Sequence, residues 1–158
     1  MKARYTVLAA IAAIGTMTAA FADEHPFAAE IKARQSLMQV YRFNLGLLGS
    51  MAKGDREYDA ELASAAAGNL LAISGMKNGA MWPAGSSEDG EGLAEHTAAK
   101  AENWSNYPLV MEKMEAMRAA LETMAAEAGN GLDAVRANIG AVGNGCKGCH
   151  EDFRASRD

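Results

Sequence analysis

The last predicted helix of this chain, residues 132–156, carries an apolar stripe that includes both cysteines. Its members recur at steps of three and four residues: Leu132, Val135, Ile139, Val142, Cys146, Cys149 and Phe153. This spacing places them on one face of an α-helix, and such a face is buried against other helices or a bound group. The stripe therefore predicts a helical bundle whose interior includes the two thiols.

Similar stripes predict three further long helices, over residues 26–53, over residues 58–77, and from a cap at Asn106 or Ser105 to about Ala128. A short helical segment is expected at residues 97–104. Residues 78–95, rich in Gly, Ser and acidic side chains, form a long loop, and such a loop in a compact domain often covers a site. No segment alternates apolar and polar residues as a half-buried strand does. We therefore expect an all-α protein, an antiparallel four-helix bundle.

The segment Cys146-Lys147-Gly148-Cys149-His150 has the spacing of a c-type haem attachment motif. Each thiol adds to one vinyl group of the porphyrin, and cysteines three residues apart share one face of a helix. His150 then brings an imidazole nitrogen beneath the iron, so we expect it to be the proximal iron ligand. The motif predicts one covalently attached haem c, with Cys146 and Cys149 as the attachment residues.

Other uses of the cysteine pair have less support. A structural zinc site needs four ligands, usually in two separated pairs, and the chain has only two cysteines and, beyond His150, only His25 and His96. A thioredoxin-like dithiol would follow a strand and open a helix, whereas this pair lies late in a predicted helix. A disulfide between consecutive turns of one helix would cross-link almost nothing. Haem attachment remains the leading interpretation.

Residues 1–22 have the features of a secretory signal peptide. A positively charged start precedes a short apolar stretch, and Ala20-Phe21-Ala22 matches a small-x-small cleavage site. The apolar stretch is too short for a comfortable membrane span. Cleavage after Ala22 would leave residues 23–158, the size of one domain. We therefore expect a periplasmic protein with no membrane span in its mature form.

The charge pattern limits the partners of the chain. The formal net charge is −5 and no run of Lys or Arg occurs, so nucleic acid is not an expected partner. An acidic surface can steer a protein towards a basic redox partner, although a solvated acidic surface needs no partner at all. No general base, nucleophile pair or polar substrate site is apparent, so we do not expect an enzyme.

Together these features resemble the cytochrome c′ family, the class II c-type cytochromes. The resemblance rests on the C-terminal haem motif, on Arg34-Gln35-Ser36-Leu37-Met38 in the first helix and on Trp82-Pro83-Ala84-Gly85-Ser86 in the loop. It extends through residues 98–104 and 142–154. It implies a four-helix bundle with one haem c, and a possible homodimer packed through the first two helices.

The resemblance also implies roles for individual residues. Arg34 and Gln35 match positions beside the haem propionates, and Thr97 falls near another such position. Met38 occupies the position that faces the iron on the side opposite His150. In the low-spin branch of the family a methionine there binds the iron. In the high-spin branch the residue there leaves the iron five-coordinate and open to nitric oxide or carbon monoxide.

We take the low-spin branch as the leading hypothesis: a periplasmic one-electron carrier with His150 and Met38 as axial ligands. A six-coordinate His/Met site suits electron transfer because its geometry changes little between oxidation states. The alternative is a five-coordinate, high-spin protein that binds nitric oxide or carbon monoxide. The chain departs from the family pattern at Asn103, usually isoleucine, and at Trp82, more commonly phenylalanine.

Overall fold

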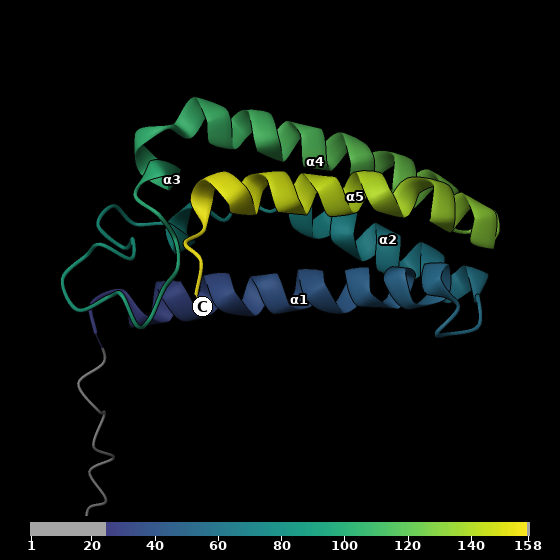
Figure 1. Ribbon diagram of the computed structural model, residues 1–158, viewed down its shortest axis with the longest axis horizontal. Coiled ribbons are helices and arrows are strands. Elements are labelled where there is room, and N and C mark those ends of the chain that lie inside the picture. The colour runs from purple at the N-terminus through teal and green to yellow at the C-terminus, as the bar shows by residue number, and fades with distance from the viewer. Residues whose placement is uncertain (1–24, 158) are drawn as a thin grey trace, which may run out of the picture.

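The computed structural model describes residues 25–157, which are helical apart from loops and one isolated β-bridge. Four long helices run side by side (Figure 1): α1 (Ala28–Lys53), α2 (Ala60–Ser74), α4 (Tyr107–Glu127) and α5 (Leu132–Phe153). The short helices η1 (Gly79–Met81) and α3 (Glu102–Ser105) lie in the connection between α2 and α4. The predicted all-α four-helix bundle is confirmed.

Two predictions concern membranes and export. The predicted signal peptide, residues 1–22, lies outside the described residues. Within residues 25–157, we find no helix that combines the length and the apolar character needed to cross a membrane.

Two helix ends differ from the predicted ones for local reasons. Asp59 caps α2, because its carboxylate accepts a hydrogen bond from the Leu62 amide at 2.9 Å, so this helix begins later than predicted. Helix α5 ends at Phe153, before the predicted residue 156. The chain there becomes extended, and the Ala155 amide donates to the Ala98 carbonyl at 2.8 Å. The chain after α5 is thereby tied at Ala155 to the segment that precedes α3.

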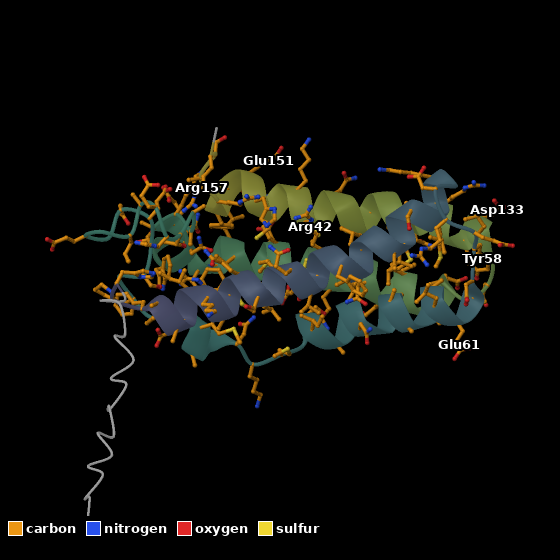
Figure 2. All side chains as sticks on the ribbon, turned by 90° about the horizontal axis from the view of Figure 1, so that it is seen from below. Arg42, Tyr58, Glu61, Asp133, Glu151 and Arg157 are labelled. Atoms are coloured by element: carbon orange, nitrogen blue, oxygen red, sulfur yellow. The ribbon has the colours of Figure 1, made fainter. Side chains whose placement is uncertain are left out.

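The apolar core lies at one end of the bundle, where α1 ends and α5 begins. Its buried members are Leu48, Met51, Ala63, Ala66, Ala67, Leu70, Leu121, Met124, Ala128, Val135 and Val142. Tyr58 closes this end, since its hydroxyl donates to the Ala128 carbonyl at 2.9 Å and accepts from the Gly131 amide at 3.0 Å. Figure 2 shows Tyr58 and Asp133 at this end and Arg157 at the opposite end.

At the opposite end the helix stripes remain partly exposed. No residue of α1 between Arg34 and Asn44 is buried, and neither is any residue of α5 between Val142 and Phe153. Met38, which lies in that part of α1, is 40% exposed. Both cysteines fall within the same part of α5. The half of the bundle beside the predicted haem motif therefore lacks the tightly packed apolar core of the other half.

Candidate haem site

Cys146 and Cys149 lie in the last turns of α5, where the motif predicts them. Both thiols are free and half-buried. Burial raises the pKa of each thiol, which argues against a redox dithiol, since that chemistry needs a lowered thiol pKa. Within residues 25–157 no group of three or more His, Cys, Asp or Glu side chains could hold a metal ion, so a zinc site finds no further ligands.

His150 follows the cysteines directly. Burial, and to a smaller extent the positive charge of Arg154, lowers the pKa of His150. The neutral imidazole is the form that binds iron. Beside the motif, Lys113 of α4 pairs with Asp152 of α5 at 3.0 Å, which links the two helices at this level. The environment of His150 therefore favours the protonation state that a proximal ligand needs.

Arg34 of α1 is a buried cation, only 4% exposed. Its Nη1 donates to the Ser86 Oγ at 2.6 Å and to the Met81 carbonyl at 3.3 Å. Its Nη2 donates to the Ser86 carbonyl at 2.9 Å and to the Thr97 Oγ1 at 3.2 Å. All four acceptors are neutral, and burial lowers the pKa of the guanidinium. The charge of Arg34 is thus hydrogen-bonded by neutral groups only, and it remains able to pair with an anion.

Two tryptophans lie against the same guanidinium. The Arg34 Cζ is 4.7 Å from the ring centroid of Trp82 and 6.0 Å from that of Trp104. The Trp104 Nε1 donates to the Trp82 carbonyl at 3.0 Å, which joins α3 to the loop. Such cation–π contacts stabilise a guanidinium that has left water. Trp104 and Ser86 were not among the predicted site residues, and only the expected long loop hinted that it covers something.

The remaining residues implied beside the propionates are placed differently from one another. Thr97 is 4% exposed and contacts Arg34, so these two residues are brought together. Gln35 is exposed, and its Nε2 donates to the His96 carbonyl at 2.8 Å. Gln35 therefore holds the backbone of the loop rather than lying in the cluster around Arg34.

Met38 and Tyr41 follow Arg34 along α1 at helical spacing. Met38 is 40% exposed, and Tyr41 is half-buried. Burial, with a smaller contribution from Cys146, raises the pKa of Tyr41 to about 12. Tyr41 was not a predicted site residue. It contributes a neutral phenol to the part of α1 that faces the attachment cysteines.

The residues present at this end fit a haem c group. Two thiols and an imidazole lie at attachment spacing on α5, and the nearby stripes are apolar and partly exposed. A buried guanidinium with neutral partners lies across the bundle on α1, where it can meet a propionate.

Comparisons with known proteins agree with this site. The sequence profile described as Cytochrome C′ matches residues 29–154. The chain belongs to the cytochrome c′ family. It is 36% identical over 124 residues to a cytochrome c-554 of Cereibacter sphaeroides, which covers 78% of this chain and 91% of the relative. It is 34% identical over 126 residues to a cytochrome c′ of Halomonas halodenitrificans, covering 79% and 95%.

Solved structures of the family are also similar. A cytochrome c′ from Rhodobacter aligns with a TM-score of 0.77 at 32% identity, covering 83% of this chain and 98% of that one. A ferrous cytochrome c′ variant from Alcaligenes xylosoxidans has bound NO; its TM-score is 0.68 at 26% identity, covering 81% and 94%. Another variant from this organism has bound carbon monoxide, with a TM-score of 0.68 at 27% identity, covering 84% and 98%. Cytochromes c′ carry one covalent haem c, so the predicted cofactor is confirmed.

The leading functional prediction is wrong. We expected a low-spin, one-electron carrier in which Met38 binds the iron opposite His150. The cytochrome c′ structures that hold NO and carbon monoxide support the five-coordinate alternative instead. The physical reason is that a thioether is a weak, neutral ligand on a flexible side chain. A methionine at the right sequence position is therefore not enough for ligation.

Proposed function

We propose that this protein is exported to the periplasm and binds a small neutral gas, nitric oxide or carbon monoxide, at a five-coordinate haem c. The observation that carries the proposal is that solved relatives of the same family hold these two gases. Export is supported by the signal-like residues 1–22 and by the haem motif, because bacteria attach haem covalently outside the inner membrane. The mature chain would comprise residues 23–158.

When bound, haem c would supply an iron able to take up NO or carbon monoxide. Cys146 and Cys149 would hold the group by thioether bonds, and His150 would bind as a neutral imidazole. Arg34 would pair with a propionate, because its planar fork matches a carboxylate and its present acceptors are neutral. The Thr97 hydroxyl has a proton that it can donate to the same carboxylate.

Met38 would form the wall on the side of the haem where the gas binds, according to its match with the family pattern. A thioether carries no charge and no hydrogen-bond donor. Water and anions therefore gain little from entering this side, since they would give up their solvation without replacement. Nitric oxide and carbon monoxide are neutral and lose little solvation. The wall would thus favour the small neutral ligands.

An absorption spectrum of the purified protein with its haem attached tests the proposal. We expect a high-spin spectrum in the oxidised form and a clear shift when the reduced protein meets carbon monoxide. Sharp low-spin bands, with a sulfur-to-iron charge-transfer band in the oxidised form, would overturn the proposal.

Replacing Met38 makes the test sharper. We expect Met38→Leu to leave the iron high-spin, because the thioether does not bind it, and to change carbon monoxide affinity only through the shape of the wall. The matched control is Met111→Leu, at another exposed methionine, on α4. A change from low-spin to high-spin in the Met38 variant alone would show that the sulfur is a ligand after all.

The proposal is for a ligand-binding protein and assigns no catalytic residue, in keeping with the expectation that the chain is not an enzyme. The redox partner proteins expected from the sequence stay a prediction. The homodimer that the resemblance implies stays a prediction. Sedimentation of the protein with and without carbon monoxide would test it.

A further inference from the structure

The last turn of α5 contains His150 and ends three residues later, at Phe153. The final carbonyl groups of an α-helix have no amide partners within the helix, and helix ends fray where those groups find no others. In this protein the His150 carbonyl accepts from the Arg154 amide at 3.1 Å, just beyond the helix. The next three carbonyls, of Glu151, Asp152 and Phe153, depend on donors from elsewhere in the chain.

All three carbonyls find donors in one segment, which leads into α3. The Lys100 Nζ donates to the Glu151 carbonyl at 3.3 Å and to the Asp152 carbonyl at 3.2 Å. The Phe153 carbonyl accepts from the Lys100 amide at 3.1 Å and from the Asn103 Nδ2 at 2.8 Å. Each of the last four carbonyls of α5 therefore has a donor, and Lys100 and Asn103 together form a cap for this helix that comes from a distant segment.

The cap is held together from within and is partly shielded from water. The Asn103 Nδ2 also donates to the Lys100 carbonyl at 2.9 Å, and the Asn103 amide donates to the same oxygen at 3.1 Å. Both residues are half-buried. The ammonium of Lys100 also suits the partial negative charge at the C-terminal end of α5. Figure 1 shows α3 beside this end of α5, and these contacts favour one fixed arrangement of the two.

Asn103 is a position at which this chain departs from the family pattern, in which isoleucine is usual. An isoleucine side chain has no hydrogen-bond donor, so it cannot complete the cap. The bond of 2.8 Å from Asn103 to the Phe153 carbonyl is therefore a feature of this sequence rather than of the fold. The pair Lys113–Asp152, at 3.0 Å, holds the end of α5 without Asn103, so the fold should tolerate isoleucine there.

His150 lies between two anchors. On its N-terminal side Cys149 would be joined to haem c, and on its C-terminal side the cap holds the last turn of α5. Groups that orient a metal ligand typically change metal affinity by about 10–100-fold. If the last turn opens locally, the His150 backbone moves and the imidazole is no longer held towards the iron. The cap therefore acts on the iron through the helix that carries the ligand.

We propose that Lys100 and Asn103 are positioning residues for the haem iron: by capping α5 they hold His150 in place and strengthen the bond between its imidazole and the iron. This inference rests on the proposed function in one respect, that His150 is the proximal ligand. It does not depend on what occupies the opposite side of the iron.

Two measurements on the protein with haem attached test this role. Resonance Raman spectroscopy gives the iron–imidazole stretching frequency of the reduced protein immediately after light has released carbon monoxide. At that moment His150 is the axial ligand that remains, so the frequency reports the strength of its bond. Hydrogen exchange of the segment 150–154, followed by mass spectrometry, reports the fraying of the last turn.

Three variants and a control separate the cap from other effects. Asn103→Ile should speed exchange of this segment about fivefold, the effect of one lost hydrogen bond, and should lower the stretching frequency. Lys100→Met removes two charge-assisted bonds, so it should speed exchange more than about tenfold and lower the frequency further. Lys100→Arg retains the charge and the donors and should recover most of both changes. The matched control is Lys77→Met, at an exposed lysine beyond α2, which should change neither value.

Three results would overturn the proposal. Unchanged exchange in Asn103→Ile and Lys100→Met would mean that the cap does not hold the last turn. Faster exchange without a lower stretching frequency would mean that the cap stabilises the helix and leaves the iron bond unaffected. An equal fall in frequency in Lys77→Met would assign the effect to the lost charge. Failure of the proposed function is a separate outcome, because it appears in the unmodified protein, as a low-spin spectrum before carbon monoxide is added.

Discussion

Replacing Arg34 by alanine should remove the main link between α1 and the long loop. The guanidinium makes two short hydrogen bonds, at 2.6 and 2.9 Å, and two longer ones, at 3.2 and 3.3 Å. A hydrogen bond to a charged group contributes about 1.5–3 kcal/mol, and a buried acceptor left without a donor costs about 1–3 kcal/mol. Removing a desolvated cation offsets part of this loss. We expect a net destabilisation of about 3 kcal/mol.

The assay is thermal unfolding of the purified protein with haem attached, followed by far-ultraviolet circular dichroism. For a domain of this size, a loss of 3 kcal/mol corresponds to a decrease in Tm of roughly 12 °C. The matched control is Arg42→Ala, at an exposed arginine of the same helix, which should change stability by less than about 0.5 kcal/mol. Arg34→Lys keeps the charge but not the planar fork, so it should fall between the two.

A second variant examines the same cluster from the loop. Thr97→Val keeps the size of the side chain and removes the oxygen that accepts from Arg34 and from the Ala99 amide, each at 3.2 Å, so it should cost about 1–2 kcal/mol. If Arg34→Ala melted within a degree or two of Arg42→Ala, the buried hydrogen bonds around the guanidinium would contribute nothing measurable. The account of how the loop is held would then be refuted.

Further predictions concern the packed end, the contact between α4 and α5, and pH. Tyr58→Phe should cost about 1–2 kcal/mol in denaturant unfolding, because two backbone groups lose the hydroxyl as a partner. Gly145→Ala should be about 1–3 kcal/mol less stable than Gly140→Ala, because its new methyl group would meet the α4 backbone at 3.1 Å whereas Gly140 has open space. The pKa of Tyr41 is raised in the folded protein, so as pH rises the phenol loses its proton in the unfolded chain before it does in the folded one. The free energy of unfolding should therefore fall as pH rises from 10 towards 12, and Tyr41→Phe should weaken this pH dependence.

Each of these predictions has a control or a contrary outcome. Tyr107→Phe, at a tyrosine that is 60% exposed, should leave stability unchanged. Gly140 and Gly145 both lie inside α5, so the higher helix propensity of alanine affects the two variants alike. Equal stabilities of the two variants would mean that α4 shifts to accommodate the new methyl group at position 145. For Tyr41, thioether formation removes the charge of Cys146 and leaves burial as the cause. An identical alkaline unfolding curve in Tyr41→Phe would contradict the raised pKa.

Local sequence patterns were sufficient to predict the helices and the haem cofactor. The stripe from Leu132 to Phe153 predicted α5 and placed both cysteines on it, because the repeat of an α-helix is a local property. The spacing of Cys146, Cys149 and His150 predicted covalent haem for the same reason, since the three side chains need only one helix to be brought together. Family resemblance added Arg34, Gln35 and Thr97 as residues expected beside the haem propionates.

The tertiary structure brings together residues that no local sequence pattern connects. Arg34 reaches Ser86 and Thr97, which are 52 and 63 residues away, and lies against Trp82 and Trp104 from two further segments. These contacts of Arg34 depend on how the whole bundle packs, so the residues that contact it cannot be predicted from sequence spacing. Whether Met38 binds the iron is decided in the same way, because it depends on how the helix holds the sulfur. Two solved relatives, both cytochrome c′ variants from Alcaligenes xylosoxidans, hold NO and carbon monoxide.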